Sequence, residues 1–220
     1  MAIFVTKQHH GGIGADDSVA NGVTTLAIAD LTNRGADTMF NVAINGYGRI
    51  GRNVLRALYE RPELNGKIQV VAINDLGSAE MSAHLTQFDT THGRFNQSVS
   101  VDQDHLIIGS DCIRMLSERD PEQLPWEQLS VDIVFECTGL FTDREAARRH
   151  IAAGAKRVLV SAPGQHMDAT VVYGINHATL TEVDVIVSNA SCTTNCLAPI
   201  AKPLNDFVGI EQGLMTTIHA

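Results

Sequence analysis

A glycine-rich turn between an apolar segment and a helical pattern most constrains how this 220-residue chain folds. Residues 40–45 carry almost no polar side chain, as expected of a parallel strand that is buried on both faces. The turn Gly-Tyr-Gly-Arg-Ile-Gly follows at 46–51, and apolar residues then recur at helical spacing as far as residue 59. A strand, this turn and a helix in that order predict the first half of a dinucleotide-binding unit.

Each glycine of this turn has a separate physical role in such a unit. Gly46 permits the tight turn, Gly48 lets the backbone approach a pyrophosphate, and Gly51 lets the helix pack closely on the strand. The helix N-terminus offers free N–H groups and a partial positive charge to the phosphates. A glycine-rich structural turn without a ligand is the alternative interpretation.

A second buried strand is predicted over residues 68–74, and it ends in Asn74-Asp75. Strand, helix and strand then form a unit whose two strands are expected to be parallel. A carboxylate at Asp75 accepts both hydroxyls of an adenosine ribose and repels a 2′-phosphate, which favours NAD over NADP. We therefore expect Asn74 and Asp75 to lie in the cofactor site.

The remaining pattern alternates strands and helices and predicts an α/β chain with a doubly wound, mostly parallel Rossmann sheet. The further elements expected are a hairpin at 106–116, strands at 131–136, 156–160, 184–188 and 213–218, and helices at 143–153 and 194–207. We expect a complete NAD-binding domain at 39–189 and the truncated beginning of an α+β catalytic domain at 190–220.

Residues 1–38 differ from the rest of the chain. They are polar and glycine-rich, with one short apolar segment at 23–29. We interpret them as an extension of unclear structure or a mis-assigned start, with Met39 as the natural beginning. An added strand or packing arm is the alternative.

Two further strand ends carry small residues. Thr138 and Gly139 follow the strand at 131–136, and Ser161 follows the strand at 156–160. Ligands of a doubly wound sheet lie at the carboxyl ends of its strands, and small side chains there leave room for a flat nicotinamide. Each segment alone also fits an ordinary loop.

The strand at 184–188 delivers Cys192 to the N-terminal end of the last predicted helix. Helix N-termini stabilise anions, so a thiol there loses its proton more readily. A nucleophilic thiolate also needs a base, and His219 at the end of the next predicted strand is the candidate. From spacing alone, a structural cysteine and a satisfied histidine are the alternative. Cys196, one helical turn further along, is expected to be buried packing.

Composition excludes several other classes of protein. The 16 Lys+Arg against 25 Asp+Glu give a net charge of −9, which argues against binding nucleic acid through phosphate neutralisation. No apolar stretch reaches the ~18–20 residues of a transmembrane helix, and the N-terminus lacks a secretory pattern. The four cysteines form neither a disulfide framework nor a zinc-binding pattern, so no metal is expected. A reduced cytoplasmic environment without membrane contact fits these features.

Six segments together resemble the glyceraldehyde-3-phosphate dehydrogenase family, and the resemblance covers residues 39–220. The segments are residues 45–52, 74–75, 88–94, 136–142, 188–196 and 216–220. The cysteine motif at 188–196 is specific to this family and its close relatives. Membership strengthens the assignment of Cys192 and His219 as the nucleophile and its base.

The resemblance implies an NAD-dependent, phosphorylating oxidation of glyceraldehyde 3-phosphate. The Cys192 thiolate attacks the aldehyde to form a thiohemiacetal, His219 takes the hydroxyl proton, and hydride moves to the nicotinamide. Inorganic phosphate then cleaves the resulting thioester, and the backbone N–H of Cys192 helps stabilise the oxyanion. The implied partners are a small phosphorylated aldehyde and inorganic phosphate, and the full-length form is implied to be a homotetramer.

The family's binding residues carry over by motif. Cofactor contacts are implied for Arg49 and Ile50 at the phosphates, Asp75 at the ribose, Arg119 at the adenine, Thr138 and Gly139 in the cleft, and Ser161 near the nicotinamide. Ser191 and Thr193 flank Cys192 and are implied to help bind the substrate phosphate.

Two departures from the family pattern bear on the substrate. Tyr47 replaces the usual Phe, and residues 164–168 lack a lysine that the family often carries. The stretch 164–174 is also similar to erythrose-4-phosphate dehydrogenase, a relative in which water more often resolves the thioester. The terminal His219-Ala220 favours the glyceraldehyde phosphate enzyme, and the relative stays the alternative.

A hypothesis of another class is that this chain binds nucleotide without turning over substrate. The family's second domain continues well past the catalytic histidine and supplies a substrate-binding arginine, a specificity loop and most tetramer contacts, none of which is found here. We expect the chain alone to bind NAD, to turn over poorly, and to expose an apolar face that promotes aggregation.

Overall fold

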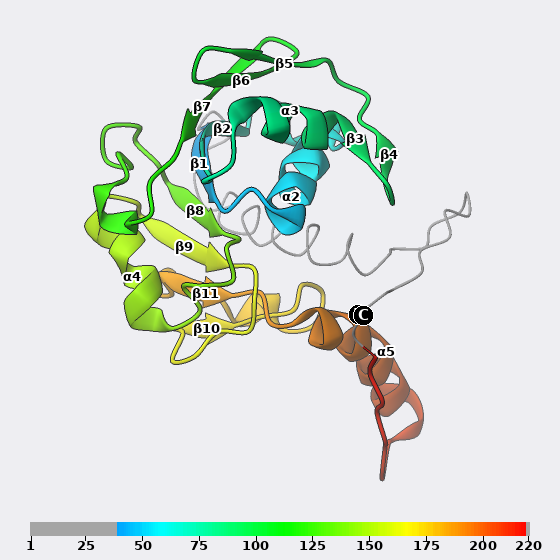
Figure 1. The fold of residues 1–220 in the computed structure, drawn as a ribbon. Helices are drawn as coiled ribbons and strands as arrows, with labels where there is room; N and C mark the ends of the chain where they lie inside the picture. The colour runs from blue at the N-terminus through cyan, green and yellow to red at the C-terminus, as the bar shows by residue number, and fades with distance from the viewer. Residues whose placement is uncertain (1–38, 219–220) are drawn as a thin grey trace.

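The computed structural model describes residues 39–218, so the predicted extension at 1–38 lies outside the described residues (Figure 1). A nine-stranded sheet forms the centre, in the order β10-β11-β9-β8-β1-β2-β7-β6-β5. Its strands are β1 (Phe40–Asn45), β2 (Ile68–Asn74), β5 (Val99–Asp102), β6 (His105–Ile108), β7 (Asp111–Leu116), β8 (Ile133–Glu136), β9 (Arg157–Val160), β10 (Ala169–Thr170) and β11 (Ile186–Ser188). A separate small sheet pairs β3 (Phe88–Asp89) with β4 (Gly93–Arg94).

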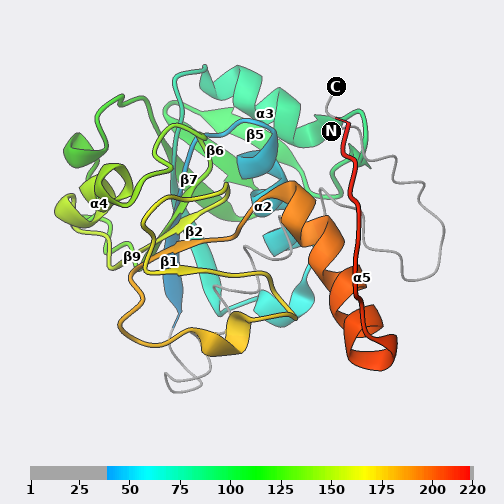
Figure 2. The ribbon, with the colours of Figure 1, turned by 90° about the horizontal axis from the view of Figure 1, so that it is seen from below.

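Helices cover both faces of the large sheet. The helices are α2 (Arg49–Tyr59), α3 (Ala79–Gln87), α4 (Arg144–Ala152) and α5 (Cys192–Val208), with short 3₁₀ turns η1 (Pro62–Leu64), η2 (Pro121–Gln123) and η3 (His177–Thr179). In both ribbon views α2 and α3 lie on one face and α4 on the other, while α5 stands out from the body (Figures 1 and 2). The predicted doubly wound α/β fold is confirmed.

The pairing of the strands places a topological switch point in the middle of the sheet. The strands β7, β2, β1, β8, β9, β11 and β10 are parallel neighbours in that order. The chain leaves β1 toward β2 on one side and later returns to β8 on the other. Ligands of such sheets bind at the carboxyl ends of the strands where the order reverses. The crevice between the ends of β1 and β8 is therefore the expected ligand site.

Burial of β1 on both faces explains why its sequence is almost wholly apolar. Val42 and Ile44 face the larger core, where Val54 and Leu55 of α2 pack against them. Ala43 points to the opposite face and packs in a second core with Trp126. Because successive side chains of a strand alternate between faces, only a strand covered on both sides needs apolar residues at consecutive positions.

Most predicted elements are present, with shifted ends. The hairpin at 106–116 is formed by β6 and β7, two strands begin two residues later than predicted, and α5 begins at Cys192 instead of residue 194. Helix α3 was not predicted, because it buries only polar side chains, Ser82 and Thr86, and so has no apolar period to detect. The short strands β3, β4, β5 and β10 were also missed.

The strand predicted at 213–218 is wrong. Residues 213–218 form neither helix nor strand and are exposed. A strand needs a neighbour to pair its backbone N–H and C=O groups, and the described part of the chain provides none at this place. Apolar and β-branched residues alone do not make a strand without such a partner.

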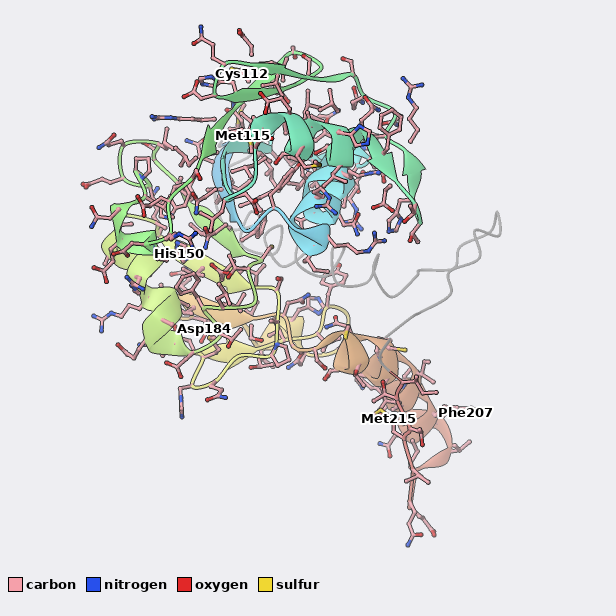
Figure 3. The ribbon with its side chains drawn as sticks, viewed as in Figure 1. Cys112, Met115, His150, Asp184, Phe207 and Met215 are labelled. Atoms are coloured by element: carbon pink, nitrogen blue, oxygen red, sulfur yellow. The ribbon has the colours of Figure 1, made fainter. Side chains whose placement is uncertain are left out.

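Helix α5 carries an unpaired apolar stripe. Leu197, Ile200, Leu204 and Phe207 recur at intervals of three and four residues, which places them on one face, and all four are exposed. Phe207 and the nearby Met215 lie on the part of the chain that extends beyond the sheet (Figure 3). The expectation of an exposed apolar face is met here.

We expect this stripe to drive self-association of the chain in solution, since burying apolar surface releases about 25 cal/mol per Å². Replacing Leu204 and Phe207 together by lysine lowers the apparent mass in size-exclusion chromatography with light scattering. Replacing Leu140, an exposed leucine away from α5, leaves the mass unchanged. A wild-type chain that runs as a monodisperse monomer contradicts the expectation.

Asp168, in the segment after β9, connects that segment to α4 and to the start of β11. Its Oδ1 pairs with Arg144 Nε at 2.8 Å, and its Oδ2 accepts the backbone N–H groups of Val185 and Ile186 at 2.9 Å each. Burial raises the pKa of Asp168, but the hydrogen bonds from Ile186, Arg144 and Val185 outweigh it and hold the pKa below its usual value. The folded state therefore favours the ionised carboxylate.

The sign of this shift predicts a pH-dependent loss of stability. Because the folded pKa is lowered, the contribution is present above the unfolded pKa of about 3.9 and is lost as the pH falls through the lower folded value. Asp168→Asn is expected to reduce the free energy of unfolding by roughly 1–2 kcal/mol at neutral pH, with the difference from wild type shrinking below about pH 4. Urea unfolding at several pH values tests this. Asp104→Asn, in an exposed pair with His105, serves as the control.

Candidate active site

The turn after β1 lies in direct contact with the turn after β8. Gly46 has a φ of +89°, and a Cβ added to it would lie 2.6 Å from the Thr138 backbone nitrogen. Gly51 is as constrained, since a Cβ there would lie 2.2 Å from the carbonyl oxygen of Gly46. Side chains at these positions would separate β1 from β8 or α2 from β1. The predicted roles of Gly46 and Gly51 in the turn and in helix packing match this geometry.

Gly48 differs from its neighbours because it borders open space. A Cβ added to Gly48 would meet no atom within 4 Å, and the residue is exposed. Gly48 caps α2 without any side-chain hydrogen bond, and the first turn of α2 holds no acidic residue. The other described α-helices are capped by Ser78, Asp143 and Ser191. No side chain therefore caps the start of α2, an arrangement that suits an anion.

Asp75 lies beside this turn at the end of β2. Its Oδ2 accepts the Tyr47 backbone N–H at 2.7 Å, and its Oδ1 accepts that of Gly77 at 2.8 Å. A carboxylate offers about four acceptor positions, so two remain for a ligand. The half-buried carboxylate is thus oriented by backbone groups and kept open on one side.

Tyr47, the departure from the family pattern, is buried and hydrogen-bonds the Thr86 hydroxyl at 2.8 Å. Burial raises the pKa of Tyr47, so the phenol stays protonated and serves as a donor. The extra hydroxyl therefore ties the glycine turn to α3. Phe at this position would have no such bond.

The other predicted cofactor residues also follow parallel strands, but their side chains differ in accessibility. Asn74 is buried, and its side-chain amide forms hydrogen bonds with Asn45 and with the backbone of Glu118. Arg119, next to Glu118, is exposed. Thr138 and Ser161 are half-buried, and Gly139 is exposed. All of them lie at the carboxyl edge of the sheet, where the strand order predicts the crevice.

Arg49 and Ile50 occupy the first turn of α2 and are half-buried. The Arg49 guanidinium pairs with Asp89 at 3.0 Å and so connects α2 to the small β3–β4 sheet. Burial raises the pKa of Asp89, but hydrogen bonds from His92 and Thr91 and the charge of Arg49 lower it. The lowering effects are larger, so the pKa lies below its usual value. A stable ion pair at this position orients the arginine beside the glycine turn.

A sharp turn presents Cys192 at the start of α5. Ala190, which follows β11 by two residues, has a φ of +58°, a conformation that non-glycine residues rarely adopt. Ser191 caps the helix by accepting the Thr194 backbone N–H at 2.9 Å. The buried Asn195 amide donates to the carbonyls of Asn189 at 2.7 Å and Ser191 at 3.0 Å. Side-chain hydrogen bonds therefore hold the turn that delivers the cysteine.

Cys192 is a free, exposed thiol at the first position of a 17-residue helix. Ser191 and Thr193 flank it and are half-buried. The thiol therefore lies at the end of α5 that carries the partial positive charge of the helix dipole. The predicted base, His219, lies outside the described residues, so its geometry toward Cys192 stays a prediction.

The remaining cysteines have different environments. Cys196 is exposed, so the prediction that it is buried packing is wrong: the face of α5 on which it lies has no covering element in the described residues. Burial raises the pKa of the Cys137 thiol to about 12, against a lowering hydrogen bond from Ser161. Cys112 is exposed on β7, far from α5 (Figure 3). Among the described residues no group of three or more His, Cys, Asp or Glu side chains could hold a metal.

Sequence reasoning missed a buried acid at the crevice. Glu136 ends β8 and is 1% exposed, and its carboxylate hydrogen-bonds Thr138, Asn45 and His150. The available signal was a charged residue closing an apolar strand, which is unusual for a fully buried position.

Two family models match this chain, one after the other along the sequence. The NAD binding domain of glyceraldehyde 3-phosphate dehydrogenase matches residues 40–144, and the C-terminal domain of the same enzyme matches residues 191–220. The chain belongs to the glyceraldehyde 3-phosphate dehydrogenase family. The first match covers the glycine turn, Asp75 and Thr138, and the second begins one residue before Cys192.

Curated relatives from bacteria support the same membership. The chain is 60% identical over 179 residues to a glyceraldehyde-3-phosphate dehydrogenase of Xanthobacter flavus and 59% identical over 180 residues to the chromosomal one of Cupriavidus necator. It is 58% identical over 179 residues to that of Pseudomonas aeruginosa. Each alignment covers 81% of this chain and 53% of the relative. The chain thus spans about half the length of the curated relatives it matches.

The described residues fit the cofactor of this family. The open space at Gly48 and the uncapped N-terminus of α2 suit a pyrophosphate, and the Asp75 carboxylate suits an unphosphorylated ribose. NAD, the cofactor named for the matching domain, meets both requirements. In the part of the chain that the structure covers, no helix is long and apolar enough to cross a bilayer.

Two glycine-to-alanine substitutions separate the binding role from the packing role. Gly51→Ala is expected to lower the free energy of unfolding by about 1–3 kcal/mol, because the new methyl group collides with the Gly46 carbonyl. Gly48→Ala meets no atom and is expected to leave stability nearly unchanged while weakening NAD binding. Urea unfolding and calorimetric titration measure the two quantities. Equal effects of both substitutions on stability would contradict this assignment.

Proposed function

We propose that this chain supplies the NAD site and the nucleophile for the phosphorylating oxidation of glyceraldehyde 3-phosphate. The observation that carries the proposal is the exposed Cys192 at the N-terminus of α5, on the same sheet edge as an open, uncapped glycine turn. Membership of the family and the names of the relatives support the substrate and the reaction.

In the proposed reaction the Cys192 sulfur attacks the aldehyde carbon and forms a thiohemiacetal. Loss of the hydroxyl proton to His219 supplies the electron push for departure of hydride. NAD, when bound, accepts that hydride. The carbon is then a thioester, which inorganic phosphate cleaves to an acyl phosphate while the thiolate of Cys192 is released. The proposed role of the Cys192 backbone N–H is to stabilise the oxyanion.

The binding roles proposed for the remaining residues follow their positions. Gly46, Gly48 and Gly51 with Arg49 and Ile50 form the phosphate side of the crevice, Asn74, Asp75 and Arg119 the adenosine side, and Thr138, Gly139 and Ser161 the nicotinamide side. Ser191 and Thr193 hold the substrate phosphate beside Cys192. We also propose a boundary between an NAD-binding domain at 39–189 and the beginning of a catalytic domain at 190–220, supported by the start of the second family match at residue 191.

The setting of the protein is proposed on the same basis. A cytoplasmic location, absence of nucleic-acid and membrane partners, and a homotetrameric full-length form agree with the family and with the net charge of −9. The second candidate function is nucleotide binding without turnover. It is supported by the features that suit NAD, the open space at Gly48 and the Asp75 carboxylate, which both lie within the described residues.

Reactivity of Cys192 provides the first test. Cys192 is expected to react with iodoacetamide faster than Cys196, because only Cys192 lies at the positive end of α5. Both thiols are exposed on the same helix, so Cys196→Ser is a matched control for Cys192→Ser. Mass spectrometry of labelled peptides gives the two rates. Equal rates would remove the basis for assigning Cys192 as the nucleophile.

Substrate assays separate the candidate functions. Formation of NADH from glyceraldehyde 3-phosphate that requires phosphate or arsenate, and that Cys192→Ser abolishes, supports the proposal. NADH formation from erythrose 4-phosphate without phosphate supports the relative instead. NAD binding by calorimetry without any NADH formation supports the second candidate.

A further inference from the structure

A row of buried polar side chains ends at the crevice. None of them takes part in the bond-making or proton-transfer steps of the proposed reaction. Asn74, Asn45 and Glu136 end the neighbouring strands β2, β1 and β8 and are direct partners in the parallel register. His150 of α4 and Trp126 continue the row, with His150 between α4 and the sheet (Figure 3). All five residues are 5% exposed or less.

The direction of the hydrogen bonds from Trp126 is fixed by chemistry. An indole N–H can only donate, and Trp126 Nε1 lies 3.0 Å from Nδ1 of His150, so that Nδ1 accepts. The proton of the neutral imidazole is then on Nε2, which lies 2.9 Å from Oε2 of Glu136. His150 therefore donates to the Glu136 carboxylate.

A second chain of bonds reaches the same oxygen from the other side. The Glu118 backbone N–H donates to Asn74 Oδ1 at 2.8 Å, which turns the amide nitrogen of Asn74 toward Asn45. Asn74 Nδ2 donates to Asn45 Oδ1 at 2.7 Å, and Asn45 Nδ2 donates to Glu136 Oε2 at 2.6 Å. Because a backbone N–H cannot accept, both amide orientations follow from this one contact.

The other carboxylate oxygen of Glu136 holds the turn after β8. Oε1 accepts the Thr138 backbone N–H at 2.8 Å and also the Thr138 hydroxyl. Four donors thus converge on one carboxylate, which offers about four acceptor positions. The hydrogen-bonding capacity of this buried carboxyl group is therefore filled by the protein itself.

The row therefore reaches both sides of the crevice. Glu136 bonds Thr138 directly on one side, and through Asn45 and Asn74 it reaches the backbone of Glu118, next to Arg119, on the other side. We infer that Glu136, oriented by His150 and Trp126, is a positioning residue that sets the spacing of the two walls for the dinucleotide. This inference rests on the proposed function insofar as the ligand of the crevice is NAD.

The wall that contains Thr138 already lies against the glycine turn. Gly46 already lies so close to the Thr138 backbone that not even a methyl group fits between them. A ligand that binds between prearranged walls avoids the entropy cost of ordering them, so loosening either wall weakens binding. Glu136 is the group on which the bonds from both walls meet.

Glu136→Gln is the most direct test. The amide has nearly the same shape but only one acceptor oxygen, so at least two of the four donors lose their partner. We expect faster amide hydrogen exchange at Thr138 and at Glu118 in the ligand-free protein. We also expect NAD affinity to fall at least about tenfold, the change that loss of one hydrogen bond to a charged group produces.

The control is a carboxylate at the opposite end of the same strand. Asp132 precedes β8, accepts the Asn41 backbone N–H at 3.0 Å and pairs with Lys156 at 2.6 Å. Asp132→Asn is expected to change stability without changing exchange at Thr138 or Glu118, or NAD affinity at temperatures where the protein is fully folded. Trp126→Phe removes the indole donor together with part of the buried ring. It should move the same readouts as Glu136→Gln by a smaller factor, and it replaces that variant if Glu136→Gln does not fold.

The outcomes separate this inference from the proposed function. Exchange that stays at the wild-type rate on both walls, or an NAD affinity that changes no more than in Asp132→Asn, overturns the positioning role. A wild-type chain that does not bind NAD overturns the proposed function. The exchange measurement then still decides whether Glu136 fixes the two walls, because it needs no ligand.

Discussion

The contact between the turn after β1 and the turn after β8 is the constraint on which the rest of the site depends. Gly46 has a left-handed backbone conformation and lies against the Thr138 nitrogen at a distance that excludes any side chain. The parallel strands can therefore part only beyond this point, toward the carboxyl edge of the sheet. The switch point, where a ligand of such a sheet is expected, lies at this edge, beside the uncapped start of α2 and the end of β8.

Helices α2 and α5 use the same physical property of a helix N-terminus for two different purposes. At α2 the cap is Gly48, which makes no side-chain hydrogen bond to the first turn, an arrangement that suits a phosphate. At α5 the cap is Ser191, whose side chain bonds the first turn, while the neighbouring Cys192 receives the partial positive charge. A ligand site needs free donors, whereas a reactive thiol needs the field and a fixed position. Cap chemistry distinguishes the two.

Burial distinguishes Cys137 from the three exposed cysteines of this chain. Cys137 follows β8 at the crevice, but loss of hydration raises the pKa of its thiol to about 12, so it stays a neutral packing group. Cys192 lies exposed at the helix end, held there by the strained Ala190 turn and the Asn195 amide. The fold thus keeps one thiol at the sheet edge inert and presents another to solvent.

The sequence by itself determined the order of elements, the glycine turn and the position of Cys192, because strand burial, helix period and turn chemistry are local properties. It predicted the fold class and the family correctly, and it placed Asp75, Thr138 and Ser161 after the strands that they follow. It failed for α3, whose fully buried side chains are polar, and for residues 213–218, whose apolar pattern has no strand to pair with in the described residues.

Only the tertiary structure decided what Glu136 does. Its donors come from β1, from α4 and from the turn after β8, segments that are between two and 91 residues away in sequence. No local pattern records such a convergence, because the hydrogen bonds exist only once parallel strands have brought their carboxyl ends to one edge. The sequence named the residues of the site, and the sheet fixed how they are held.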